Sequence, residues 1–193
     1  MARVKTFDQH EVLEKAMQLF WTKGYYDTSV NDLVKHTGLS RSSLYDTYGD
    51  KHRLYILALK KYQEDMGSAM KKLVESADSI KDTLNQLFRM AINDSLEDKF
   101  NRGCFMVNTS VEVGHRNKEI GNLVSANQDD IEKAFRKAIK KGQKTGEISK
   151  KHKSKSLARF LFNTYAGLKV NAKHNPSQKQ LENIVNVALS AID

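Results

Sequence analysis

A single proline, Pro176, stands in this chain of 193 residues, and that scarcity limits the fold more than any other feature. Proline removes a backbone donor and clashes with the preceding turn, so a chain nearly free of it keeps long helices unbroken. The rest of the sequence is rich in Leu, Ala, Lys, Glu and Gln, which are good helix formers. We therefore expect an all-α protein that is long enough to bury a core without disulfide bonds.

The spacing of apolar and capping residues divides the chain into about nine helices. The N-cap candidates include Ser29, Ser40 and Asp50. Val12, Ala16, Leu19 and Phe20 form the apolar stripe of the first helix, which Gly24 ends. The predicted helices cover residues 7–23, 29–37, 40–48, 50–75, a segment from 79 to beyond 92, 103–113, 118–141, 156–172 and 177–192.

Several site classes are excluded by composition. Cys104 is the only cysteine, which rules out an intramolecular disulfide and a zinc site of clustered thiolates. The six histidines form no H-x-x-x-H or H-E-x-x-H pair, so we predict no metal site and no cofactor. No segment is apolar over the roughly eighteen residues of a membrane span, and the first residues lack the apolar stretch of a secretory signal. These features predict a cytoplasmic protein.

The formal net charge of +9 is unevenly distributed. Residues 1–53 carry eight Lys/Arg against seven Asp/Glu, whereas residues 136–155 carry nine Lys/Arg and one Glu. Such a basic run is usually a solvated helix end and loop. The alternative is an architectural DNA-binding protein that uses this run without sequence preference.

The most informative segment is TSVNDLVKHTGLSRSSLYDTYGDK, residues 28–51. It predicts a helix, a tight turn at Gly38 and a short second helix, which is a helix-turn-helix arrangement. In that arrangement the second helix enters the major groove of DNA. Leu44 is expected to point inward, into a small core with Leu19, Val30 and Val34. The side chains expected on the exposed face are Arg41, Ser42, Ser43, Tyr45 and Tyr48.

Residues 7–57 resemble the N-terminal domain of TetR-family repressors. The resemblance rests on LFWTKGYYDTSV and on DLVKHTGLSRSSLYDTYGDKHRL, in which Val34 replaces the alanine usual in the family. It implies a dimeric, sequence-specific transcriptional regulator that binds a pseudo-palindromic double-stranded operator and is not an enzyme.

The resemblance also implies roles for single residues. Thr28 and Lys51 match phosphate-contacting positions, which set register and salt dependence. Ser29, the N-cap candidate next to Thr28, is counted with them among the DNA-binding residues. Arg41, Ser42 and Ser43 match the base-reading positions. Tyr45 and Tyr48 match an aromatic pair that supports the recognition helix and reaches the DNA backbone. Asp46 and Thr47 depart from the family pattern, and they leave the operator sequence open.

By the same resemblance, residues 1–53 form the DNA-binding domain and residues 54–193 the ligand-binding and dimerisation domain. The last two helices, residues 156–172 and 177–192, would pair with those of a second copy. Their apolar faces would be exposed in a monomer, unless they close the monomer's own core. The interface candidates are Leu161, Leu168, Leu181, Ile184, Val185 and Ala188.

The segment RGCFMVNTSVE, residues 102–112, resembles a branch of the family that senses reactive electrophiles. With Gly103 as the helix cap, Cys104 would lie in the first turn, where the helix dipole and Arg102 favour the thiolate. The alternatives are that Cys104 is a small buried apolar residue, or that it is an enzyme nucleophile with His115 as its base.

A small-molecule effector is the other means of release that we expect, in a pocket among the fourth to eighth helices. It would favour a conformation in which the fourth helix moves the two DNA-binding domains of the dimer out of register with the DNA. The pocket candidates, each of which has plain core as its alternative, are Met66, Met70, Phe88, Ile92, Phe105, Asn108, Phe162 and Tyr165.

Overall fold

The computed structural model describes residues 7–75 and 78–193, with the side chains of residues 69–75 (and so that of Met70) excepted. Within these ranges it confirms the all-α prediction, with nine α-helices and no strand. The helices are α1 (Gln9–Lys23), α2 (Val30–Thr37), α3 (Arg41–Tyr48), α4 (Lys51–Glu75), α5 (Ile80–Glu97), α6 (Phe105–Thr109), α7 (Lys118–Thr145), α8 (Ser154–Asn171) and α9 (Gln178–Leu189). A π-helical turn, η1 (Ser110–Gly114), follows α6.

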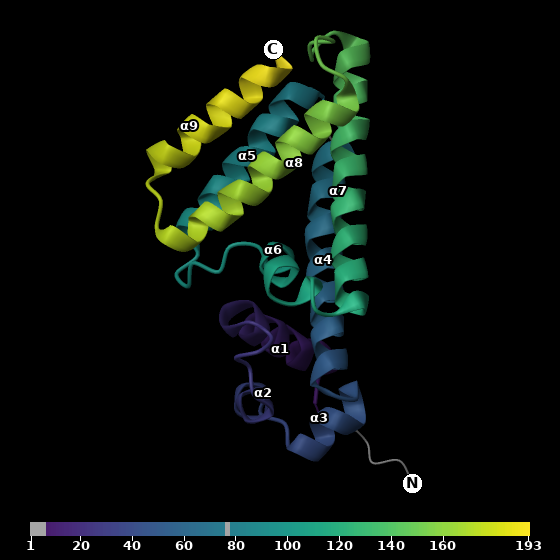
Figure 1. The fold of residues 1–193 in the computed structure, drawn as a ribbon, viewed down its shortest axis with the longest axis vertical. Helices are drawn as coiled ribbons and strands as arrows, with labels where there is room; N and C mark the ends of the chain where they lie inside the picture. Colours follow the sequence, from purple (N-terminus) through teal and green to yellow (C-terminus); the bar gives the residue numbers. More distant parts are fainter. Residues whose placement is uncertain (1–6, 76–77) are drawn as a thin grey trace.

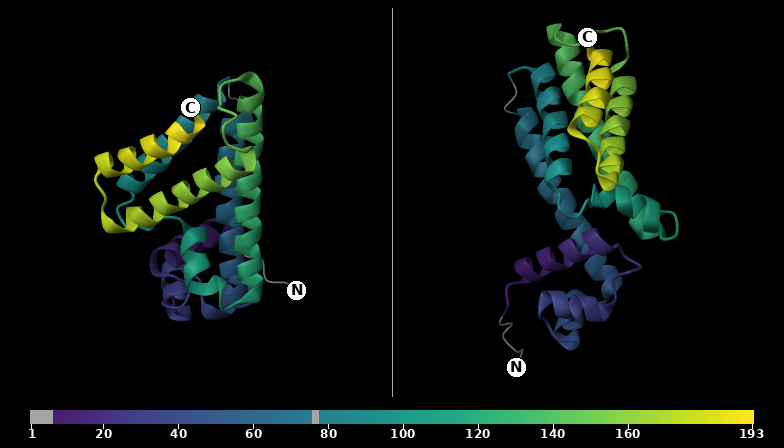
Figure 2. Two further views of the ribbon diagram at one scale, coloured as in Figure 1. Left: turned by 45° about the horizontal axis from the view of Figure 1, so that its top comes forward. Right: turned by 90° about the vertical axis from the view of Figure 1, so that its left-hand side faces the viewer.

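Helices α1–α3 form one end of an elongated molecule, and α5, α8 and α9 lie toward the other end (Figure 1). The long helices α4 and α7 connect the two ends and contact each other. The short α6 lies between the two ends of the molecule, next to α1–α3, as the two further views also show (Figure 2). None of the described helices is both long and apolar enough to cross a bilayer.

Capping residues account for the helix boundaries near the N-terminus. Asp8 caps α1, because its carboxylate accepts from the backbone N–H of His10 at 2.7 Å. Ser29 and Asp32 form a reciprocal capping box at the start of α2. Asp50 accepts from the N–H of Arg53 at 2.8 Å and begins α4. The predicted caps at residues 29 and 50 are therefore confirmed.

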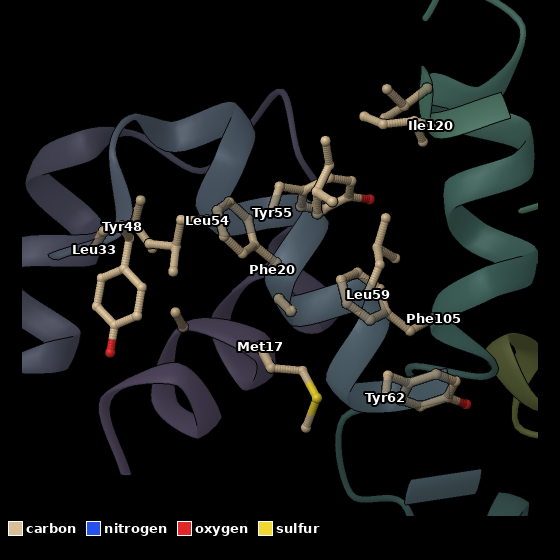
Figure 3. Close-up of a cluster of buried hydrophobic side chains, with 14 of the residues drawn as sticks. Met17, Phe20, Leu33, Tyr48, Leu54, Tyr55, Leu59, Tyr62, Phe105 and Ile120 are labelled. Atoms are coloured by element: carbon tan, nitrogen blue, oxygen red, sulfur yellow. The ribbon is translucent and has the colours of Figure 1, made fainter. Parts of the chain in front are cut away.

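The first buried cluster joins α1–α4 to α6, η1 and the beginning of α7. Phe20 and Tyr55 are fully buried at its centre, with ring centroids 4.9 Å apart in an edge-to-face arrangement. Figure 3 shows Phe105 and Ile120 packing on this cluster from the later part of the chain. The α1–α3 head is thus packed against residues distant in sequence.

Leu44 lies in this cluster as predicted, with 1% of its surface exposed. Its predicted neighbours are partly wrong, because Val30 and Val34 are only half-buried. Leu33 lies on the inward side of α2 and is completely buried in the same cluster, and Leu19 packs against it. The rotation of α2 therefore places one large side chain, rather than two smaller ones, in the core.

A second cluster joins α5, α7, α8 and α9. Here the prediction of broadly exposed apolar faces on α8 and α9 is wrong. Five of the six interface candidates are at most 5% exposed, since they pack inside this cluster: Leu161, Leu168, Leu181, Val185 and Ala188. Ile184 is 40% exposed, and the other exposed large apolar residues of these two helices are Phe160, Val170 and Val187.

Candidate nucleic-acid interface

The turn between α2 and α3 fixes where α3 begins. Gly38 adopts a left-handed conformation with φ of 77°, and its N–H donates to the carbonyl oxygen of Val34 at 3.0 Å. A residue in this left-handed conformation ends α2, and glycine adopts the conformation without the strain that a side chain would cause. Ser40 then caps α3, because its Oγ accepts from the N–H of Ser43 at 3.2 Å. The sequence signals for both boundaries are confirmed.

One face of α3 is turned toward solvent. Arg41, Ser42 and Asp46 are exposed, and Ser43 and Tyr45 are half-buried. The Arg41 guanidinium lies 5.8 Å from the centre of the Tyr45 ring, so these two side chains share one surface. A cation, hydroxyl groups and a phenol next to one another can donate to and accept from the edges of base pairs.

The opposite face of α3 anchors the helix. Tyr48 was expected among the exposed residues, but it is only 7% exposed. Its hydroxyl donates to the carbonyl oxygen of Gln9 at 2.9 Å and so ties α3 to the first turn of α1. Burial, with Asp8 nearby, raises the pKa of Tyr48. The expected supporting role of Tyr48 matches this geometry, whereas its expected exposure does not.

Thr28 and Ser29 precede α2 and differ in accessibility. Thr28 is completely buried, and its hydroxyl donates to the carbonyl oxygen of Gly24 at 2.6 Å. The hydroxyl therefore shapes the loop, and it is not exposed for the phosphate contact predicted for it. Ser29 is exposed and bonds Asp32 through both its N–H and its Oγ. These bonds and the Lys23 ammonium lower the pKa of Asp32 far below its usual range.

Lys51 is the first residue of α4 and lies close to the loop between α1 and α2. Its Nζ is 4.4 Å from the centre of the Tyr25 ring. Partial burial lowers the pKa of Lys51, and the nearby carboxylate of Glu112 opposes that shift. An ammonium that has already lost part of its hydration loses less hydration free energy when it contacts a phosphate.

Cys104 packs against the first buried cluster. Gly103, at φ of 68°, was expected to cap α6, but the cap is Cys104 itself. Cys104 therefore lies just before the first turn and not in it. The thiol is half-buried, and the Tyr62 hydroxyl donates to its Sγ at 3.6 Å. Arg102 was expected to favour the thiolate of Cys104, but its guanidinium bonds Asp98 and lies over the ring of Trp21.

A buried lysine close to Cys104 was missed from the sequence. Lys169 of α8 is 7% exposed, and its Nζ donates to the carbonyl oxygen of Ala91 at 3.2 Å. Burial lowers the pKa of Lys169, while Asp94 and Cys104 act in the opposite direction. A signal was present, because Lys169 follows Tyr165 by four residues on the apolar side of its helix.

The structure divides the pocket candidates between two cavities. One, of about 380 Å³, lies among α4, α5, α7 and α8 and includes Met66 and Tyr165 in its wall. The other, of about 330 Å³, lies among α1, α6, η1 and α8 and includes Phe105 and Asn108. The other candidates with described side chains line neither of these cavities: Phe88 and Ile92 are core residues, and Phe162 packs against that core.

The basic run 136–155 lies at the end of α7 and in the connection to α8, at the opposite end of the molecule from α3 (Figure 1). Its Lys and Arg side chains are exposed. No group of three or more His, Cys, Asp or Glu side chains arranged for a metal ion occurs in the described part of the chain.

Two family models match the chain. The model described as "Bacterial regulatory proteins, tetR family" matches residues 12–57, which include α2 and α3. The model described as "Tetracyclin repressor-like, C-terminal domain" matches residues 80–188. Together they include most residues of both buried clusters.

The chain is similar, over nearly its full length, to proteins named as transcriptional regulators. The uncharacterized HTH-type transcriptional regulator YezE of Bacillus subtilis is 31% identical, with 100% of both chains covered. The HTH-type transcriptional repressor ComR of Escherichia coli is 28% identical, with 97% of this chain and 90% of ComR covered.

Solved structures agree. A cysteine mutant of the regulator CifR, complexed with 26-bp double-strand operator DNA, has a TM-score of 0.89 and 26% identity over 100% of both chains. The reduced form of E. coli NemR has a TM-score of 0.87 at 17% identity, covering 95% of this chain and 96% of NemR, and supports the fold alone.

Proposed function

The chain belongs to the TetR family of bacterial transcriptional regulators, and from that premise we propose that it is a repressor of a pseudo-palindromic double-stranded operator. The observation that carries this proposal is the two-sided character of α3. Arg41 and Ser42 face solvent while Leu44 and Tyr48 fix the helix from behind. A helix held in this way can enter the major groove without losing its support. Such a protein would act in the cytoplasm, and it is not an enzyme.

We assign base reading to Arg41, Ser42, Ser43 and Tyr45. Arginine suits guanine, because its donors match the two acceptors that guanine presents in the major groove. Ser29 and Lys51 flank this surface and are assigned to phosphates, since they lie at the starts of α2 and α4. We leave the hydroxyl of Thr28 out, because it is buried.

We keep the division into a DNA-binding domain, residues 1–53, and a ligand-binding and dimerisation domain, residues 54–193. A homodimer would present two copies of α3 to half-sites about one DNA turn, roughly 35 Å, apart. Exposed apolar residues on α8 and α9 support pairing there: Phe160, Ile184 and Val187.

The DNA assignment is tested with operator duplexes selected from a random pool by the wild-type chain. Arg41→Ala and Tyr45→Ala should weaken operator binding at least tenfold, about 1.4 kcal/mol, and should leave the dimer folded. Lys150→Ala, in the basic run at the far end, serves as the matched control. Wild-type affinity for both α3 variants would refute the assignment. Binding that is instead lost with Lys150→Ala would favour the architectural alternative.

For release from DNA we propose that Cys104 reacts with thiol-reactive electrophiles. Its thiol is half-buried and accepts from Tyr62, and the buried cation Lys169 lies close enough to interact with it electrostatically. A thiol that is half-buried, and so not fully enclosed, can be reached by a small electrophile. The cavity that includes Met66 and Tyr165 supports the other route, a non-covalent effector.

Treatment with N-ethylmaleimide separates the two routes. Wild-type protein should gain one adduct by mass and lose operator binding, whereas Cys104→Ser should keep binding and gain no adduct. Adduct formation without loss of binding would refute the sensor role. A thermal-shift screen of small aromatic compounds, run on both proteins, would then identify ligands that bind the cavity.

A further inference from the structure

Glu112 forms a contact between two parts of the chain that are distant in sequence. It lies in η1, and its Oε1 accepts from the backbone N–H of Tyr26 at 2.8 Å, across 86 residues. Gly24, with φ of 86°, leaves room for this carboxylate, because a Cβ there would lie 2.8 Å from Oε2. The loop between α1 and α2 is therefore shaped to receive the Glu112 side chain.

This loop carries the proposed DNA-binding helices. Its Gly24 carbonyl accepts from the buried Thr28 hydroxyl, and Ser29 follows directly as the cap of α2. Lys51, a proposed phosphate contact, lies over the ring of Tyr25 in the same loop. A change in the path of the loop would consequently move α2, α3 and the Lys51 ammonium relative to α1.

The segment that holds Glu112 is itself firmly placed. Gly121 of α7 packs so closely against η1 that a Cβ on it would lie 2.5 Å from the carbonyl oxygen of Gly114. On the other side, the hydroxyls of Thr109 and Tyr55 are 2.8 Å apart and link α6 to α4. A π-helical turn is rare, and such turns are frequent at functional sites. Here it follows α6 and presents the carboxylate to the loop.

We propose that Glu112 is a positioning residue for DNA binding: its hydrogen bond to the Tyr26 N–H holds the α1–α2 loop, and through it α2 and α3, in the orientation that fits the operator. This inference rests on the proposed function. Glu112 acts through the backbone and does not itself contact DNA, where a carboxylate would repel phosphates.

Two substitutions separate positioning from charge. Glu112→Gln removes the charge and keeps an oxygen that accepts from Tyr26, whereas Glu112→Ala removes both. If Glu112 positions the loop, Glu112→Gln should bind the selected operator like wild type or slightly better. Glu112→Ala should bind about tenfold more weakly, the effect of losing a hydrogen bond to a charged acceptor. Equal affinities of the two variants would overturn the proposal.

A matched control and a readout independent of DNA complete the test. Glu119→Ala removes an exposed carboxylate that pairs with His52 and should leave operator affinity unchanged. Amide hydrogen exchange at Tyr26 should accelerate in Glu112→Ala and stay slow in Glu112→Gln. Unchanged exchange in Glu112→Ala would also overturn the proposal. If wild type selects no operator while the Tyr26 exchange responds as stated, the proposed function fails and the contact stands.

Should Glu112→Ala fail to fold, Glu112→Asp is the second variant. It keeps the charge but shortens the side chain by one methylene, so its carboxylate no longer reaches the Tyr26 N–H. It should weaken operator binding and accelerate exchange at Tyr26, and wild-type behaviour in both measurements would contradict the positioning role.

Discussion

Replacing Lys51 with methionine should change how operator binding depends on salt. The Lys51 Nζ lies over the Tyr25 ring, and methionine keeps an apolar side chain there while it removes the charge. Each phosphate that a protein cation neutralises contributes about 0.9 to the slope of log affinity against log salt concentration. A dimer loses two such contacts, so the slope should fall by about 1.8.

This change in slope predicts a measurable convergence of affinities. Between about 50 and about 200 mM salt, the affinity deficit of Lys51→Met relative to wild type should shrink about 12-fold. Fluorescence anisotropy titrations with the selected operator at four or five salt concentrations would measure it. Lys150→Met is the charge-matched control and should keep the wild-type slope. A weakened Lys51→Met with an unchanged slope would show that Lys51 makes no phosphate contact.

Three further predictions concern stability and are measured by urea denaturation. Leu44→Ala, at a fully buried site, should cost about 3 kcal/mol; a loss below about 1 kcal/mol would contradict that packing. Tyr48→Phe removes the hydroxyl bonded to Gln9 and should cost about 1 kcal/mol, with an unchanged value counting against the bond. Hydrogen bonds from Thr145 and from the N–H groups of Lys81 and Ile80 lower the pKa of Glu147, so its contribution is complete above the ordinary carboxyl pKa and is lost as the pH falls through the depressed value. Glu147→Gln should flatten this acid side of the stability profile, and a parallel profile would refute the linkage.

Local signals predicted the head of the molecule well. The caps at Ser29 and Ser40 and the turn at Gly38 are confirmed, because each depends on hydrogen bonds within four residues along the chain. The apolar periodicity likewise predicted the helices and the inward direction of Leu44. Such features need no knowledge of the tertiary packing.

Tertiary contacts set the rest, and sequence reasoning missed them. The hydroxyl of Tyr48 finds its acceptor 39 residues away, and Glu112 finds the Tyr26 N–H across 86 residues. Helical periodicity identifies an apolar face but not its partner, which is why α8 and α9 residues expected at an interface lie in the chain's own core. The burial of Lys169 depends in the same way on how α8 packs on α5.

The length of α4 has a mechanical consequence. Its 25 residues correspond to a rigid rod of about 38 Å. Its first turns are embedded in the cluster with α1, and farther along Met66 borders the larger cavity. Lys51 lies 15 residues before Met66, about 22 Å along the helix, so a tilt of about 5° at the cavity would displace the beginning of α4 by about 2 Å, more than half the spacing of one base pair. If the cavity binds the proposed effector, we expect a small adjustment there to become a larger displacement of the proposed DNA-binding helices.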